Sequence, residues 1–198
     1  TMLDPTAGKQ QRTTTSPIRR ELIRNEFLDG NIVPKQASNR WHSIIATNFM
    51  IAIGSRVHRG TSEVYGGDMP VRLGANSICF PDVVVVSGEP EFTDASAELL
   101  LNPTVVIEIS STMAKFGGRS QKLEGFLAIP KIKECLLVNE SEMRIEHYAR
   151  QNAKQWIYRI YDERDDVISL DSINCKLSMT EVYTQVKLKE GLTSTAVG

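Results

Sequence analysis

Two short and very apolar segments, each carrying one carboxylate, constrain the fold of this chain more than any other feature. Residues 82–87 read Asp-Val-Val-Val-Val-Ser directly after Pro81, and residues 105–110 read Val-Val-Ile-Glu-Ile-Ser. A run of four valines indicates a strand that is covered on both faces. We therefore expect Asp82 and Glu108 on adjacent central strands, where two like charges are costly unless a cation compensates them.

The remaining pattern predicts an α/β or α+β domain with a mixed central sheet flanked by helices. A helix is expected from a cap at Ser38 or Asn39 to about Gly54, because apolar residues recur there at helical spacing. A second helix is expected over residues 120–128, ahead of Pro130. Further strands are expected at residues 62–65, 69–73 and 134–139.

Two hairpins complete the expected elements. Asp29-Gly30 is typical of a tight turn and predicts a hairpin over residues 20–33. Residues 144–149 and 156–161 predict an extra antiparallel strand pair around Gln151-Asn152. After residue 170 we expect only a tail that ends in a short helix.

The length of 198 residues suits one ordinary domain. We expect a flexible leader at residues 1–17, a single domain at 18–190 and a flexible tail at 191–198. No apolar run approaches the ~20 residues of a membrane helix, so no membrane partner is expected. The three separate cysteines form no metal or disulfide motif. We expect them to be reduced and buried, which suits a cytoplasmic protein.

The carboxylate pair is followed by a lysine, Lys122, fourteen residues after Glu108. Mg²⁺ is often held by one or two carboxylates and keeps several waters, so Asp82 and Glu108 are candidate metal ligands. A nearby lysine can orient a metal-bound water or stabilise charge on a phosphate. These residues predict a metal-dependent phosphodiesterase, with a nuclease as the leading hypothesis. The net charge of −1 does not by itself indicate nucleic-acid binding. A local basic patch is still available from Lys115, Arg119, Lys122, Lys131 and Lys133.

Several segments together resemble the Uma2 family (DUF820), a group of proposed restriction endonucleases in the PD-(D/E)XK superfamily. The segments are Glu26-Phe-Leu-Asp-Gly30, Gly67-Asp68-Met-Pro-Val-Arg72, Pro81-Asp82 with its valines, Asn102-Pro103 through Glu108-Ile-Ser-Ser, Lys122-Leu-Glu-Gly-Phe and Ile129 to Val138. The resemblance spans about residues 26–182 and implies a restriction-endonuclease-like core.

The resemblance also implies a mechanism and a set of supporting residues. Asp82 and Glu108, helped by the Ile109 carbonyl, would hold Mg²⁺, or Mn²⁺ in its place, and Lys122 would position the attacking water or stabilise the phosphate. Glu26, His42 and Asp68 would support the site. The implied reaction is hydrolysis of DNA phosphodiester bonds by a metal-activated water.

Two departures from the family pattern keep other functions open. Ser110 stands where the superfamily has a lysine, and Gly118 stands where Uma2 members commonly have an aspartate. One alternative is a catalytically weakened nuclease-fold protein that binds nucleic acid or protein. Another is a phosphoesterase for a small phosphate substrate. A homodimer is also expected, because cutting both strands needs two sites, and the strand pair near Tyr148 and Trp156 could supply the interface.

Overall fold

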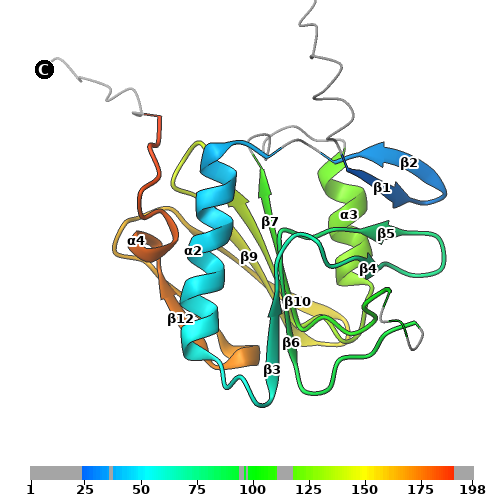
Figure 1. Cartoon of the computed structure of the whole chain (residues 1–198). Helices are drawn as coiled ribbons and strands as arrows, with labels where there is room; N and C mark the ends of the chain where they lie inside the picture. The colour runs from blue at the N-terminus through cyan, green and yellow to red at the C-terminus, as the bar shows by residue number, and fades with distance from the viewer. Residues whose placement is uncertain (1–23, 36–37, 94–95, 97, 111–117, 190–198) are drawn as a thin grey trace, which may run out of the picture.

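Figure 1 shows the computed structural model of the chain, which describes residues 24–35, 38–93, 96, 98–110 and 118–189. The expected leader and tail lie outside these residues. The strands are β1 (Asn25–Leu28), β2 (Asn31–Pro34), β3 (Ser62–Tyr65), β4 (Val71–Arg72), β5 (Ile78–Cys79), β6 (Val83–Ser87), β7 (Val105–Ser110), β8 (Glu134–Asn139), β9 (Ile145–Asn152), β10 (Gln155–Tyr161), β11 (Val167–Leu170) and β12 (Cys175–Ser178). The helices are α2 (Arg40–Arg56), α3 (Gly118–Leu127), α4 (Met179–Val182) and the 3₁₀ turn η1 (Asp171–Ile173).

A six-stranded mixed sheet forms the centre of the fold, in the order β10-β9-β8-β7-β6-β3. The β7–β8 pair is parallel, and the other pairs of this sheet are antiparallel. This confirms the expected mixed sheet. In the β6–β7 ladder Val83 lies opposite Ile107, so the next positions outward on the two strands are Asp82 and Glu108. The register therefore brings the two predicted carboxylates to one end of the central strand pair.

The four valines of β6 are fully buried because each face of the sheet is covered. Val83 and Val85 point to the α2 side, and Val84 and Val86 point to the α3 side. Side chains alternate along a strand, so Glu108 shares the α3 side with Val106. Helix α3 can therefore bring a side chain to Glu108, whereas Asp82, just before β6, is reached by His42 of α2.

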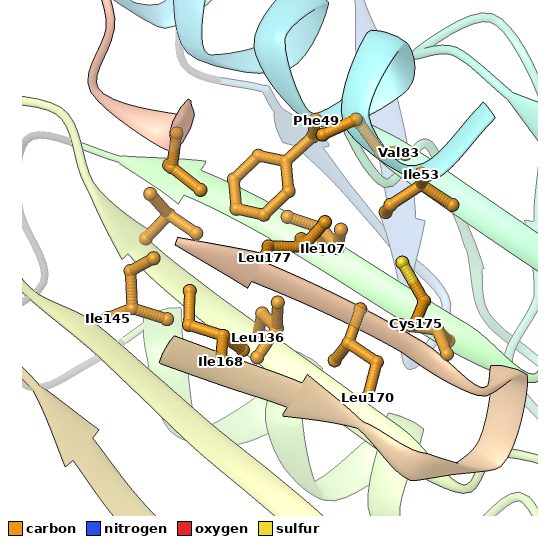
Figure 2. Close-up of a cluster of buried hydrophobic side chains, with 14 of the residues drawn as sticks. Phe49, Ile53, Val83, Ile107, Leu136, Ile145, Ile168, Leu170, Cys175 and Leu177 are labelled. Atoms are coloured by element: carbon orange, nitrogen blue, oxygen red, sulfur yellow. The ribbon is translucent and has the colours of Figure 1, made fainter. Parts of the chain in front are cut away.

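Two hydrophobic cores result. Figure 2 shows the larger one, in which Phe49 and Ile53 of α2 pack on the sheet, with β11 and β12 closing the cluster. Phe126 of α3 belongs to the smaller core on the opposite face. All three cysteines are buried and free, as expected, and burial raises the pKa of each thiol.

Helix α2 begins at Arg40 because the Asn39 side chain caps it. Asn39 Oδ1 accepts a hydrogen bond from the backbone N–H of His42, at 2.9 Å. Asn39 is thus the cap, of the two candidates named from the sequence. The helix carries His42 on its first turn and buries that side chain against the sheet.

Strands β1 and β2 form the expected hairpin, with Leu28 paired to Asn31 across the Asp29-Gly30 turn. Both turn residues have positive φ, 49° and 81°, which Gly30 adopts without the steric penalty of a Cβ. The hairpin joins β5 and β4 in a four-stranded sheet beside α3. Its position places the inward-facing residues of β1 next to the carboxylate pair.

Two local features differ from the sequence expectation. The β9–β10 pair exists, but its turn lies at Ala153-Lys154, because Asn152 pairs with Gln155. The stretch after residue 166 forms the hairpin β11–β12 before α4. Ile168, Leu170 and Leu177 of this hairpin are fully buried in the larger core, and this burial stabilises strands too short to form alone.

Candidate functional site

Asp82 lies just before β6 and is tied to β7 through its backbone and its side chain. Its N–H donates to the Ile107 carbonyl at 3.0 Å, and its Oδ2 accepts a hydrogen bond from the Ile109 N–H at 2.7 Å. The side chain is only 5% exposed. These bonds fix the carboxylate at the end of the ladder, so its position does not depend on a loop.

The imidazole of His42 and the ammonium of Lys35 both contact the other carboxylate oxygen of Asp82. Its Oδ1 lies 2.9 Å from His42 Nε2 and 3.0 Å from Lys35 Nζ. Burial raises the pKa of Asp82, but the hydrogen bond from His42 and the charge of Lys35 outweigh burial and hold the pKa below its usual value. Asp82 is therefore an ionised carboxylate over a wide pH range.

Glu108 and Glu26 share one lysine. Lys122 Nζ, projecting from α3, lies 2.9 Å from Glu108 Oε1 and 2.9 Å from Glu26 Oε2. Burial lowers the pKa of Lys122, but the charges of Glu108 and Glu26 outweigh it and raise the pKa above its usual value. Lys122 is thus a protonated ammonium group, suited to stabilising negative charge and unsuited to removing a proton.

Glu108 is the least satisfied member of the cluster. Its Oε1 is buried and, apart from the close ammonium of Lys122, receives no well-directed hydrogen bond from the residues that the structure describes. Burial raises the pKa of Glu108 more than the Lys122 charge lowers it. A buried carboxylate oxygen of this kind gains from an added cation, since burying a charge without full compensation is unfavourable.

Glu26 on β1 closes the cluster from the hairpin side. Its Oε2 also accepts a hydrogen bond from the Phe80 N–H, at 2.7 Å, and the side chain is 6% exposed. Through this bond the hairpin is held against the segment that leads into β6. Glu26 therefore connects Lys122 with the backbone just before Asp82.

His42 bridges two carboxylates. Its Nε2 contacts Asp82, and its Nδ1 lies 3.5 Å from Glu140 Oε2. Glu140 Oε1 accepts a hydrogen bond from Asn39 Nδ2 at 2.7 Å. Burial lowers the pKa of His42, but Asp82 and Glu140 outweigh burial and raise it. The imidazole thus acts as a cation that orients Asp82, and both of its nitrogens are engaged.

The structure brings five of the six predicted site residues together, namely Asp82, Glu108, Lys122, Glu26 and His42. The sixth does not join them. The Asp68 side chain is 93% exposed and pairs with Arg24 at 2.5 Å. That pair touches the site only indirectly, because the Arg24 guanidinium lies 4.6 Å above the Phe80 ring.

Two site residues escaped the sequence analysis, Lys35 and Glu140. Lys35 follows β2, and the alternation of the hairpin places it on the same face as Glu26, so this signal was available. Glu140 follows β8, and its N–H donates to the Ser110 carbonyl at 3.2 Å. Nothing in the local sequence separates Glu140 from an ordinary loop glutamate.

The cluster suits a divalent cation by its charge and its donors. Four carboxylates, from Glu26, Asp82, Glu108 and Glu140, face two ammonium groups and one imidazole. Carboxylate oxygens are the ligands that Mg²⁺ prefers, and one or two of them suffice. Within the described ranges no three His, Cys, Asp or Glu side chains converge as a ready metal cage. An ion bound here would take its carboxylate ligands from Asp82 and Glu108 and its remaining ligands from water.

The chain is similar to one protein family and to two proteins of a cyanobacterium, Synechocystis. The model of the Uma2 family, described as "Putative restriction endonuclease", matches residues 12–181. An uncharacterized protein of Synechocystis, sll1609, is 30% identical over 135 residues, which are 68% of this chain and 76% of that protein. A second uncharacterized protein of the same organism, slr1290, is 21% identical over 83% of this chain and 85% of its own length.

A solved structure shares the fold. The crystal structure of a "putative nuclease belonging to DUF820" from Anabaena variabilis matches with a TM-score of 0.65 and 20% identity, over 80% of this chain and 89% of that chain. This match confirms the expected restriction-endonuclease-like fold. In the part of the chain that the structure describes, no helix is both long and apolar enough to span a membrane.

Proposed function

The chain belongs to the Uma2 family, and from this premise we propose that it is a metal-dependent endonuclease that hydrolyses DNA phosphodiester bonds. The observation that carries the proposal is the meeting of Asp82, Glu108 and Lys122 at the end of β6 and β7. Carboxylates that hold Mg²⁺ beside a fixed ammonium group are the components needed for phosphodiester hydrolysis. Mn²⁺ is expected to substitute for Mg²⁺.

The metal-binding role falls to Asp82 and Glu108. When bound, the ion would supply Lewis-acid activation of a water and of the phosphate. His42 and the Ile109 N–H hold Asp82 in one orientation, so the ligand is positioned before the ion arrives. Glu140 and Asn39 in turn fix His42.

Lys122 would act through its charge. Its ammonium lies between Glu26 and Glu108, and the side chain as a whole is 12% exposed. Its raised pKa keeps the proton on Nζ. In this proposal Lys122 stabilises the charge that develops on the phosphate and orients the attacking water, while Glu26 fixes the ammonium.

One feature favours the alternative of a binding module. Helix α3 begins at Gly118, so the position four residues before Lys122 offers no carboxylate. A site weakened in this way would still bind nucleic acid, but it would cut slowly or not at all. Metal-dependent strand breakage distinguishes this alternative from the proposal.

The test is a plasmid-nicking assay with Mg²⁺ and with Mn²⁺. The wild type should convert supercoiled DNA to nicked and linear forms, and Glu108→Gln should reduce the rate at least about 100-fold, the size expected for losing a fixed electrostatic group. The matched control is Glu124→Gln, an exposed glutamate on α3, which should cut like the wild type. Equal rates for wild type and Glu108→Gln would refute the proposal. Salt-dependent DNA binding without cutting would support the binding module instead.

A further inference from the structure

Lys35 is the site residue whose role the proposed function leaves open. Its backbone is fixed, because its N–H donates to the Arg24 carbonyl at 2.8 Å and extends the β1–β2 ladder by one step. Its side chain reaches inward to the site and is 15% exposed. The backbone anchor is thus fixed, and the side chain is partly exposed.

The ammonium of Lys35 contacts the Asp82 oxygen, Oδ1, through which Asp82 could bind a metal ion. Nζ lies 3.0 Å from Asp82 Oδ1 and donates a hydrogen bond to the Phe80 carbonyl. His42 takes the second direction at the same oxygen. A carboxylate oxygen offers about two lone-pair directions, so Lys35 and His42 together saturate Oδ1.

Of the cationic side chains described around Asp82 and Glu108, Lys35 is the one most easily displaced from its carboxylate. His42 is held in the first turn of α2 and by Glu140, and Lys122 is held by both Glu26 and Glu108. Among the described residues Lys35 has one carboxylate partner and one carbonyl partner. Its loss from Asp82 would leave that carboxylate still fixed by His42 and Ile109.

We propose that Lys35 is a built-in competitor of the divalent cation: its ammonium neutralises Asp82 in the metal-free protein and must be displaced before metal binds through Asp82 Oδ1. This inference rests on the proposed metal site and adds a regulation to it. The displaced ammonium stays on its anchored backbone beside the site. There it is available to the anionic phosphate of a substrate, so binding of substrate would favour binding of metal.

Loss of the Lys35 charge should lower the stability of the metal-free protein but raise its affinity for metal. In Lys35→Met the stem is retained and the charge is lost. Without metal, Asp82 loses a partner, so the melting temperature should fall. With the competing charge gone, Mn²⁺ and Mg²⁺ should bind at least about 10-fold more tightly, because a unit charge close to a divalent ion in a partly buried site is worth more than this. A lysine that merely supports the structure would lower both stability and metal affinity.

The experiment is calorimetric titration of Mn²⁺ and Mg²⁺ into wild type, Lys35→Met, Lys35→Arg and Lys176→Met, with melting curves in chelator and in metal. Lys176 is exposed on β12 and controls for the change in net charge. Tighter binding by Lys35→Met than by the wild type and the other two variants would support the proposal. Unchanged or weaker binding by Lys35→Met, with normal binding by wild type, would overturn it while leaving the proposed function intact. Absence of binding in all four proteins would overturn both.

Discussion

Removal of the Lys122 ammonium should destabilise the protein in a pH-dependent way. In Lys122→Met the stem length is kept, but Glu26 and Glu108 lose the ammonium that lies 2.9 Å from each of them. Breaking a buried ion pair by removing one partner costs about 3–5 kcal/mol. We expect about 3 kcal/mol at pH 7.5, the lower end, because the side chains of Lys122 and Glu108 are 12% and 17% exposed and Glu108 can take up a proton.

The pH dependence follows from the direction of the Glu108 shift. Burial already holds the pKa of Glu108 above its usual value of 4.5, and loss of the Lys122 charge raises it further. A carboxyl group with a raised pKa binds more protons in the folded state, so the free energy of unfolding falls as the pH rises. The deficit of the variant should therefore be larger at pH 7.5 than at pH 5.

The assay is thermal unfolding of wild type, Lys122→Met and Lys131→Met, an exposed lysine just after α3. For a domain of this size about 3 kcal/mol lowers the melting temperature by roughly 6–12 °C, whereas the control should stay close to wild type. A melting temperature for Lys122→Met equal to that of the control would refute the account of the cluster. So would an equal loss at pH 5 and pH 7.5.

Three further predictions concern the fold and the assembly. Ser178→Ala removes the hydroxyl of the capping box with Glu181 and should cost about 1 kcal/mol in urea unfolding. The backbone N–H of Ser178 and also its hydroxyl hold the pKa of Glu181 low, and the variant loses the hydroxyl part, so this cost should shrink as the pH falls through the usual glutamate range. Gly30→Ala should cost about 1 kcal/mol through its positive φ alone, since no atom of the described residues lies within 4 Å of the new Cβ, and an unchanged urea midpoint would contradict this interpretation of the turn. Light scattering should show a dimer that Tyr158→Glu and Ile160→Glu weaken, as these exposed residues lie on the edge strand β10, and a monomeric wild type at high concentration would remove this prediction.

The sequence predicts the centre of the fold well because the strongest constraints there are local. Four consecutive valines require burial on both faces, and a buried strand fixes which way Asp82 and Glu108 can point. The Asp29-Gly30 turn likewise determines the hairpin that carries Glu26. The β11–β12 hairpin escaped prediction because its alternation spans only four residues per strand and its stability comes from tertiary burial.

The site was predictable in part for similar reasons. Asp82, Glu108 and Lys122 stand out by residue type in apolar surroundings. Lys35 follows from the hairpin alternation once Glu26 is placed inside, but Glu140 depends on the parallel alignment of β7 and β8, which no local pattern specifies. The β9–β10 turn was misplaced because neither Gln151-Asn152 nor the observed turn Ala153-Lys154 contains glycine, the residue that marks such turns most clearly.

The central claim is that Asp82 and Glu108 form a metal site that cuts DNA, and one titration tests its foundation most directly. Mg²⁺ and Mn²⁺ are titrated calorimetrically into the wild type and into Asp82→Asn, which keeps the shape of the side chain, with circular dichroism to check that both are folded. The account predicts binding to the wild type that is lost or weakened at least about 10-fold in Asp82→Asn. Equal metal binding by the two folded proteins, or none by either, would contradict it.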